Sequence, residues 1–358
     1  LVHVLHFVPG RSLVAAAAGK DTAVLWSADS DDPLHVLAGH TGHIVDVQFF
    51  PQGDKLLTLG VDCRVLVWSV ASGRQLRAIR GHDQETVFAV EVLPSGDRFL
   101  TVGGDFTAVL WDWARGEEVM RFRQEDEPAA HQAAKVLRGA ARFVTGVSYV
   151  LGGSVLVWNA SSGEVLHALR QPGFPVRRLE VSPGGDVVAT GSDHRLWLWS
   201  ALSGRVLHGP LGGHVGWITG VTFAHGGRKI VTCGNDRRVV VSDVGSGDQA
   251  MMRMDASVLG VVGAPWGQLV VPFQATSAVV WNTTSSSFLR SLEGPASFEQ
   301  MAVSARGDLV AACSSGAGRS AVWLWRLSTG RLLRTWRSAS ALPTRHCGIS
   351  FATSSVFD

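Results

Sequence analysis

A short apolar run that ends in tryptophan recurs along the chain. Seven copies of this run end at Trp26, Trp68, Trp111, Trp158, Trp199, Trp281 and Trp325. An eighth copy, residues 239–241, ends at Ser242 instead, and successive run ends lie 39 to 47 residues apart. The runs are apolar at consecutive positions, which is typical of strands buried on both faces. A period of this length predicts a small β-sheet unit repeated eight times.

Glycine-rich turns repeat in phase with these runs. One set precedes the second predicted strand of a unit, as in Pro51–Asp54 and Pro94–Asp97, and another follows the tryptophan strand, as in Ala71–Arg74. Glycine supplies the positive φ that tight hairpins need. One isolated sheet could not bury two apolar faces, whereas a ring of sheets can. The pattern therefore predicts an all-β fold, a β-propeller of four-stranded antiparallel blades.

The chain resembles the WD-repeat family, whose motif combines a Gly-His pair, a turn Asp and a closing Trp-Asp. The Gly-His pair appears as Gly39-His40, Gly81-His82 and Gly213-His214. The turn aspartates stand six residues before a run end, at Asp62, Asp105, Asp193 and Asp236. The closing dipeptide is intact at Trp111-Asp112. The resemblance covers nearly the whole chain and implies a ring of WD-repeat blades.

Eight repeat units fit between residues 1 and 336. Their expected limits are about 1–38, 39–80, 81–122, 123–169, 170–212, 213–254, 255–294 and 295–336. Residues 337–358 are expected to begin a further strand or to close a blade. A seven-bladed ring, with one end unit belonging to a neighbouring propeller, is the alternative. Because the chain starts at Leu1 within a strand-like run, we expect a fragment of a longer multi-repeat protein.

The resemblance implies that the polar motif residues are structural. In the family, a His, a strand Ser or Thr, the turn Asp and the Trp form a buried hydrogen-bonded tetrad. The expected sets are His40, Thr58, Asp62 and Trp68; then His82, Thr101, Asp105 and Trp111; then His214, Thr232 and Asp236, truncated at Ser242. A buried carboxylate is tolerated where donors surround it. We therefore interpret these residues as architecture and not as a hydrolytic site.

A candidate partner-binding rim follows from aligning the first strands of the blades. In propellers of this family, residues entering these strands point to the face around the channel. The alignment gives His43, Val45, Phe88, Arg177, Trp217, Thr219 and Glu299. The aromatic side chains Trp217 and Phe88 favour a protein interface. The alternative is that Trp217 packs over the adjacent blade.

Composition and charge bound the function. Hydrophobic residues make up 46% of the chain and charged residues 17%, with a net charge of +2. Arg177-Arg178 and Arg237-Arg238 are isolated pairs and form no basic stripe, so nucleic-acid binding is not favoured. The acidic residues of the first strands appear at differing phases, so we expect no catalytic ring of carboxylates; they are Asp46, Glu91, Glu180 and Glu299. We expect no cofactor and no metal, since His40 and His43 lack a third ligand.

The four cysteines, Cys63, Cys233, Cys313 and Cys347, show neither disulfide nor zinc spacing, which suits a reducing compartment. No run of 18 apolar residues predicts a membrane span. We therefore expect an intracellular, cytoplasmic and non-catalytic scaffold or adaptor that binds protein or peptide partners, as part of a large assembly. A cytoskeletal or ciliary, microtubule-associated assembly factor is the alternative subtype; a propeller enzyme and an RNA-binding module are less favoured.

Overall fold

The computed structural model describes most of the chain. The described residues are 2–8, 12–18, 21–80, 82, 86–123, 131–137, 139, 141–149, 152–171, 176–264, 267–294, 298–316 and 319–337. The further strand expected after residue 337 lies outside them.

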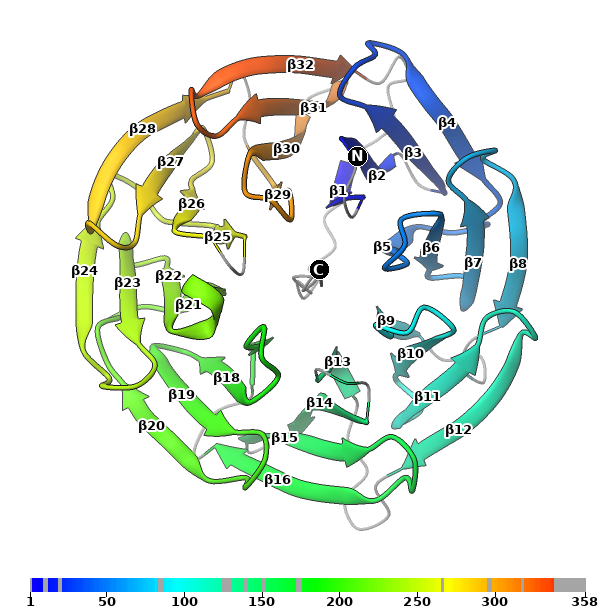
Figure 1. Ribbon diagram of the computed structural model, residues 1–358, viewed down its shortest axis with the longest axis horizontal. Coiled ribbons are helices and arrows are strands. Elements are labelled where there is room, and N and C mark those ends of the chain that lie inside the picture. Colours follow the sequence, from blue (N-terminus) through cyan, green and yellow to red (C-terminus); the bar gives the residue numbers. More distant parts are fainter. Residues whose placement is uncertain are drawn as a thin grey trace.

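Eight four-stranded antiparallel sheets, the blades, lie around one axis and are numbered 1 to 8 in chain order (Figure 1). The innermost strands are β1 (Val2–Phe7), β5 (Ile44–Phe49), β9 (Val87–Val92), β13 (His131–Val136), β17 (Arg178–Val181), β21 (Ile218–Ala224), β25 (Gly260–Gly263) and β29 (Gln300–Val303). The second strands are β2 (Leu13–Ala18), β6 (Lys55–Gly60), β10 (Arg98–Gly103), β14 (Arg142–Tyr149), β18 (Val187–Ser192), β22 (Lys229–Gly234), β26 (Leu269–Phe273) and β30 (Leu309–Gly316).

The third strands carry the tryptophan runs, and the fourth strands form the outer edge. The third strands are β3 (Thr22–Ser27), β7 (Arg64–Ser69), β11 (Thr107–Asp112), β15 (Gly152–Asn159), β19 (Arg195–Ser200), β23 (Arg238–Asp243), β27 (Ser277–Asn282) and β31 (Arg319–Arg326). The outer strands are β4 (Pro33–Ala38), β8 (Gln75–Arg80), β12 (Glu117–Arg123), β16 (Val165–Gln171), β20 (Val206–Leu211), β24 (Gln249–Arg253), β28 (Ser287–Glu293) and β32 (Arg331–Arg337).

The predicted eight-bladed ring is confirmed, and the seven-bladed alternative is excluded. Helix is confined, in the described residues, to the three-residue 3-10 segment η1 (His225–Gly227). None of the chain described here forms a helix long and apolar enough to cross a membrane.

The hydrophobic core lies between blades. Each cluster of buried side chains combines residues of two adjacent blades, and the clusters together cover all eight blade-to-blade interfaces. In the cluster between blades 1 and 2, for example, Leu25 of β3 packs with Leu56 of β6 and Trp68 of β7. Blades are thus held by side-chain packing on both faces, as their consecutive apolar residues require.

Among the residues that the structure describes, the ring closes without strand exchange, because each blade is contiguous in sequence and no strand of blade 8 joins the sheet of blade 1. At this junction Trp336 of β32 stacks on Trp26 of β3, with ring centroids 5.8 Å apart. The Trp336 indole N–H donates to the Ser30 carbonyl at 3.0 Å, and Arg334 pairs with Asp31 at 3.2 Å.

A repeated contact, here called the outer clasp, links successive blades at the circumference. The residues that can form it lie on the outer strands, opposite the position just before each run end. This position is occupied by His35, Arg77, Met120, His167, His208, Ala250, Arg290 and Arg334. His35 Nε2 donates to the Ala71 carbonyl of the next blade at 3.1 Å, and His167 Nε2 donates to the Leu202 carbonyl at 2.9 Å.

Two further outer clasps join Arg77 to the Ala114 carbonyl and His208 to the Gly245 carbonyl. Ala250 of blade 6 is too short to reach the next blade. There, His225 of η1 and Thr283 of blade 7 form a hydrogen bond of 2.7 Å instead. The closing pair Arg334–Asp31 is the blade 8 version of the same device.

The two faces of the ring differ in their loops. The upper face, as named here, carries the loops between blades and the turns between second and third strands. Backbone bonds fasten these together, for example Val61 N–H to the His43 carbonyl at 2.8 Å. The lower face carries the other hairpins, fastened by bonds such as Val70 N–H to the Asp54 carbonyl at 2.9 Å.

Replacing Trp336 by alanine should destabilise the whole ring, because this side chain, 3% exposed, fills the closing interface. A buried aromatic truncation costs about 3–5 kcal/mol in free energy of unfolding. Urea unfolding followed by tryptophan fluorescence measures this. Leu332→Ala on the same strand is the control, since Leu332 is 45% exposed and should matter little. Equal stabilities for the two variants would contradict closure by packing.

Candidate functional site

The first predicted tetrad forms one chain of hydrogen bonds. The Trp68 indole N–H donates to Thr58 Oγ1 at 2.9 Å, and Thr58 Oγ1 lies 2.8 Å from His40 Nε2. His40 Nδ1 lies 2.9 Å from Asp62 Oδ1. The simplest proton order has Thr58 donating to Nε2 and Nδ1–H donating to the carboxylate, which leaves the imidazole neutral.

The second and third sets are brought together in the same way. His82 Nδ1 lies 2.7 Å from Asp105 and its Nε2 3.0 Å from Thr101, which accepts from Trp111 at 2.8 Å. In the third set, His214 stands between Asp236 and Thr232 at 3.1 and 2.9 Å. Where tryptophan is missing, Ser242 Oγ accepts from the Gln249 amide at 3.0 Å.

These hydrogen bonds keep the aspartates ionised. Burial by itself raises the pKa of Asp105, but bonds from His82 and Thr107 outweigh it and lower the pKa to about 2. The pKa of Asp62 and that of Asp236 are also lowered, since backbone N–H groups and the histidine outweigh burial. Carboxylates with their hydrogen bonds satisfied in this way stabilise the turns that carry them and have a structural role.

Sequence spacing missed related pairs in blades 4 and 5. Trp158 donates to Thr145 at 2.9 Å, and Trp199 donates to Thr190 at 2.9 Å. In blade 5, Gln171 replaces the histidine and accepts from Thr190 at 2.8 Å. In each blade with such a pair, the threonine lies two residues after the second-strand residue that faces the run end. The hairpins between the second and third strands of blades 4 and 5 differ in length from those of the three predicted sets. Strand register, and not a fixed spacing to tryptophan, is the signal that finds them.

The Asp105→Ala variant should lose a few kcal/mol of stability, about 2–4, because it leaves buried donors without an acceptor. Thermal unfolding of the variant and of the wild type measures the loss. The matched control is Asp255→Ala, since Asp255 is exposed on a loop. An unchanged melting temperature for Asp105→Ala would falsify the structural role of the tetrad.

A second polar system lines the centre of the ring. One register position on the eight innermost strands, here called the channel layer, is occupied by His6, Gln48, Glu91, Lys135, Glu180, Thr222, Val262 and Ala302. It is polar in blades 1 to 6 and apolar in blades 7 and 8. Lys135 pairs with Glu91 at 3.7 Å, and the Gln48 amide donates to Glu91 at 3.2 Å.

The channel layer corrects part of one expectation. The acidic residues Asp46, Glu91, Glu180 and Glu299 were predicted to stand at differing strand phases. Asp46 and Glu299 do lie outside the layer, but Glu91 and Glu180 share it. Lys135 of blade 4 lies between the two and pairs with Glu91. The layer is therefore a mixed-charge belt and provides no pair of neighbouring carboxylates.

Burial perturbs the charged groups next to this layer. Desolvation raises the pKa of Asp46 to about 7, with the Glu91 carboxylate contributing in the same direction. Desolvation and Lys135 lower the pKa of His6 to about 4. His6 Nε2 lies 3.8 Å from Asp46 Oδ1, and burial also raises the pKa of Glu91.

The Asp46→Asn variant should gain stability relative to the wild type as the pH rises. Between the ordinary pKa of 3.8 and about 7, folded Asp46 keeps a proton that the unfolded chain has released, so the wild type loses stability across this window. Asparagine cannot ionise and avoids this loss. Urea unfolding at about pH 5 and about pH 8 checks the difference, which should be larger at the higher pH. The side chain at position 46 faces the same residues in both proteins, namely His6, Gln48, Glu91 and Lys135. A difference independent of pH would contradict the raised pKa.

The predicted rim residues take different positions. His43 is exposed, whereas Phe88 and Glu299 are half-buried. Val45 packs against the core cluster between blades 2 and 3. The Thr219 hydroxyl donates to the Val258 carbonyl at 2.6 Å and so fastens blade 6 to blade 7.

The two remaining rim residues form a pair, here called the Trp–Arg pair. Trp217 is 57% exposed, and the Arg177 guanidinium lies 5.4 Å from its ring centroid. The backbone around Trp217 is fixed, because its carbonyl accepts from Asn235 at 3.0 Å and the next N–H donates to Asp193. Val215 in the same loop is 75% exposed. A fixed, exposed aromatic beside a cation is a suitable anchor for a partner.

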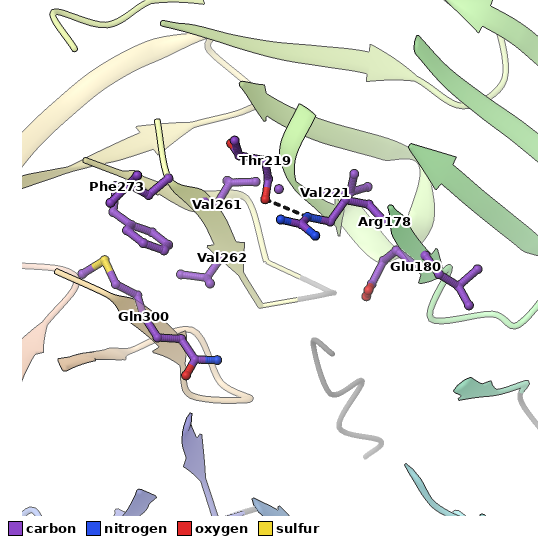
Figure 2. A pocket seen from close by; sticks show the side chains of 13 residues that line it. Arg178, Glu180, Thr219, Val221, Val261, Val262, Phe273 and Gln300 are labelled. Atoms are coloured by element: carbon purple, nitrogen blue, oxygen red, sulfur yellow. Dashed lines mark hydrogen bonds between the residues drawn. The ribbon is translucent and has the colours of Figure 1, made fainter. Parts of the chain in front are cut away.

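A recess opens beside this pair in the wall of blades 5 to 8 (Figure 2). It is partly open to solvent, and its cavity volume is about 50 Å³. Arg178 lines it from blade 5, Thr219 from blade 6, Phe273 from blade 7 and Gln300 from blade 8. The Arg178 side chain is held by its Nε–H bond to the Thr219 carbonyl at 2.8 Å.

Sequence reasoning missed this recess because it depends on how closely the innermost strands of four blades approach one another. In the register position next to the channel layer, Arg178 and Gln300 flank Gly220 and Gly260. Both glycines lie where two innermost strands approach closely: a Cβ at Gly220 would stand 2.8 Å from the Val261 backbone N. No group of three or more His, Cys, Asp or Glu side chains suited to a metal occurs in the part of the chain described here.

Comparison with known proteins identifies repeats of one family in this chain. The family model of the WD domain, G-beta repeat, matches residues 31–69, 73–112, 163–200 and 205–243. Each match begins in or next to the outer strand of one blade and ends at the third strand of the next, so each repeat covers parts of two blades.

An uncharacterized WD repeat-containing protein of Nostoc sp. is 40% identical to this chain over 63 residues. That stretch is 18% of this chain and 5% of the relative, so the match spans a small part of the relative's length.

Proposed function

The chain belongs to the WD-repeat β-propeller family, and from this premise we propose that it is a non-catalytic scaffold that docks protein partners on its upper face. Propellers of this kind commonly act as interaction platforms. The Trp–Arg pair carries the proposal, because Trp217 is exposed while the peptide group that follows it is held by hydrogen bonds of both its carbonyl and its N–H. Rigid aromatic and arginine side chains dominate the binding energy of protein interfaces.

The absence of a catalytic role is supported by how the polar side chains are used. In the described tetrads, His and Asp bond to one another and to Thr. In the channel layer, Glu91 bonds to Lys135 and Gln48. The His and Thr side chains of these tetrads are also buried, which supports a structural role over a catalytic one.

A protein partner suits this surface better than a nucleic acid. The net charge is only +2, and the sequence has no basic stripe. Nothing in the described residues favours the cytoskeletal or ciliary subtype over other scaffolds, so the proposal ends at the class of partner. An intracellular location suits the free thiols of Cys63, Cys233 and Cys313.

The Trp217→Ala variant should lose at least one discrete partner in affinity purification with the purified chain as bait, followed by mass spectrometry. Loss of a central interface aromatic weakens binding by about 2 kcal/mol or more, roughly thirtyfold. Leu202→Ala is the matched control, because Leu202 is 64% exposed but lies in a lower-face hairpin. Both variants should melt as the wild type does. An identical set of partners for all three proteins would remove the upper face around Trp217 from consideration.

A further inference from the structure

We propose that the Trp–Arg pair and the recess beside it form one composite site for an extended acidic–apolar peptide, with a carboxylate bound at Arg177 and an apolar side chain in the recess. This inference rests on the proposed function, since it names the chemistry of the partner for the same face. Four observations carry it: the continuity of the two parts, the charge at the pair, the shape of the recess and one buried acceptor.

The two parts are continuous because the same two chain segments build both. Arg177 belongs to the pair and the adjacent Arg178 lines the recess. Trp217 belongs to the pair, and Thr219, two residues further along the chain, lines the recess (Figure 2). Two residues of extended strand rise about 7 Å. A peptide lying along these segments would therefore place side chains of residues i and i+2 in the two parts.

The pair attracts an anion. Among the ion pairs of the described residues, none involves Arg177, whose guanidinium lies over the Trp217 ring. Arg177 and Arg178 also repel each other, and together with burial this lowers the pKa of Arg178. A carboxylate placed at Arg177 would offset the repulsion and accept hydrogen bonds from a planar donor already fixed by stacking.

The recess favours an apolar side chain. Most of its walls are apolar and include Val261, Val262, Phe273 and Leu259, the last of which is 41% exposed, while Glu180 lines one side. The recess is partly open to solvent and its cavity volume is about 50 Å³, so we expect the tip of one apolar side chain to enter it and the remainder to lie over its mouth.

One polar atom points to a peptide and not to an isolated apolar molecule. Gln300 Oε1 is buried and has no hydrogen-bond partner among the described residues. A buried acceptor without a donor is costly, and a bound backbone N–H would satisfy it. The composite site thus matches a carboxylate, a large apolar side chain two residues later, and a main-chain donor.

Fluorescence polarisation with labelled heptapeptides tests the proposal on the intact chain. The probe is Gly-Ser-Glu-Ala-Leu-Ser-Gly, compared with versions carrying Lys in place of Glu or Ser in place of Leu. We expect either replacement to weaken binding by about tenfold or more, the loss of one good contact. Binding of the Glu probe should fall with added salt, since it depends on an exposed charge.

Two variants separate the parts of the site. Arg177→Glu should weaken the Glu probe and improve the Lys probe, while Val262→Phe should remove the preference for Leu over Ser by filling the recess. Arg253→Glu, an exposed cation on outer strand β24, is the matched control and should change nothing. Circular dichroism melting verifies that each variant is folded.

The outcomes distinguish this inference from the proposed function. No binding of the Glu probe, equal binding of the Glu and Lys probes, or an Arg177→Glu variant that binds as the wild type does, would each overturn the composite site. If Trp217→Ala still loses a discrete partner in the purification, the scaffold function stands and only the peptide chemistry is wrong. If neither experiment shows an effect, both are rejected.

Discussion

Every blade has two apolar faces, and water must be kept from both. This requirement orders the rest of the structure, since an isolated four-stranded sheet would leave both of its apolar faces exposed to water. The core is accordingly divided into clusters that each span two blades. The outer clasps add directional bonds to this packing at the circumference, where His35 and His167 reach the next blade.

The same constraint determines where polar groups can go. Strand ends carry the tetrads, in which a histidine links an ionised Asp to Thr, and the centre carries the mixed-charge channel layer. These groups are largely satisfied by one another, so they stabilise the ring and contribute little to its outer surface. Recognition then falls to loop side chains such as Trp217, which belong to neither system.

The sequence predicted the regular features well and the irregular ones poorly. Eight run ends predicted eight blades, and fixed spacing located the residues of three tetrads, because hairpins of equal length preserve register. Thr145 and Thr190 were missed since their hairpins differ in length, and the shared strand position of Glu91 and Glu180 became clear only from the pairing of the innermost strands. The sequence could not separate the exposed rim residues from the buried ones. Val45 and Trp217 are both apolar residues at the start of a first strand, and only the packing of the blades shows that Val45 contacts the core.

In the described residues each blade is contiguous in sequence, and side chains such as Trp336 join the last blade to the first, so no shared strand fixes the number of blades in the ring. The wedge angle between neighbours, set by the sizes of facing side chains, does so instead. The number of blades therefore depends on the volumes of the side chains between them. A related sequence could gain or lose one blade and, with altered side-chain volumes at the interfaces, close a ring of different diameter with the same connectivity.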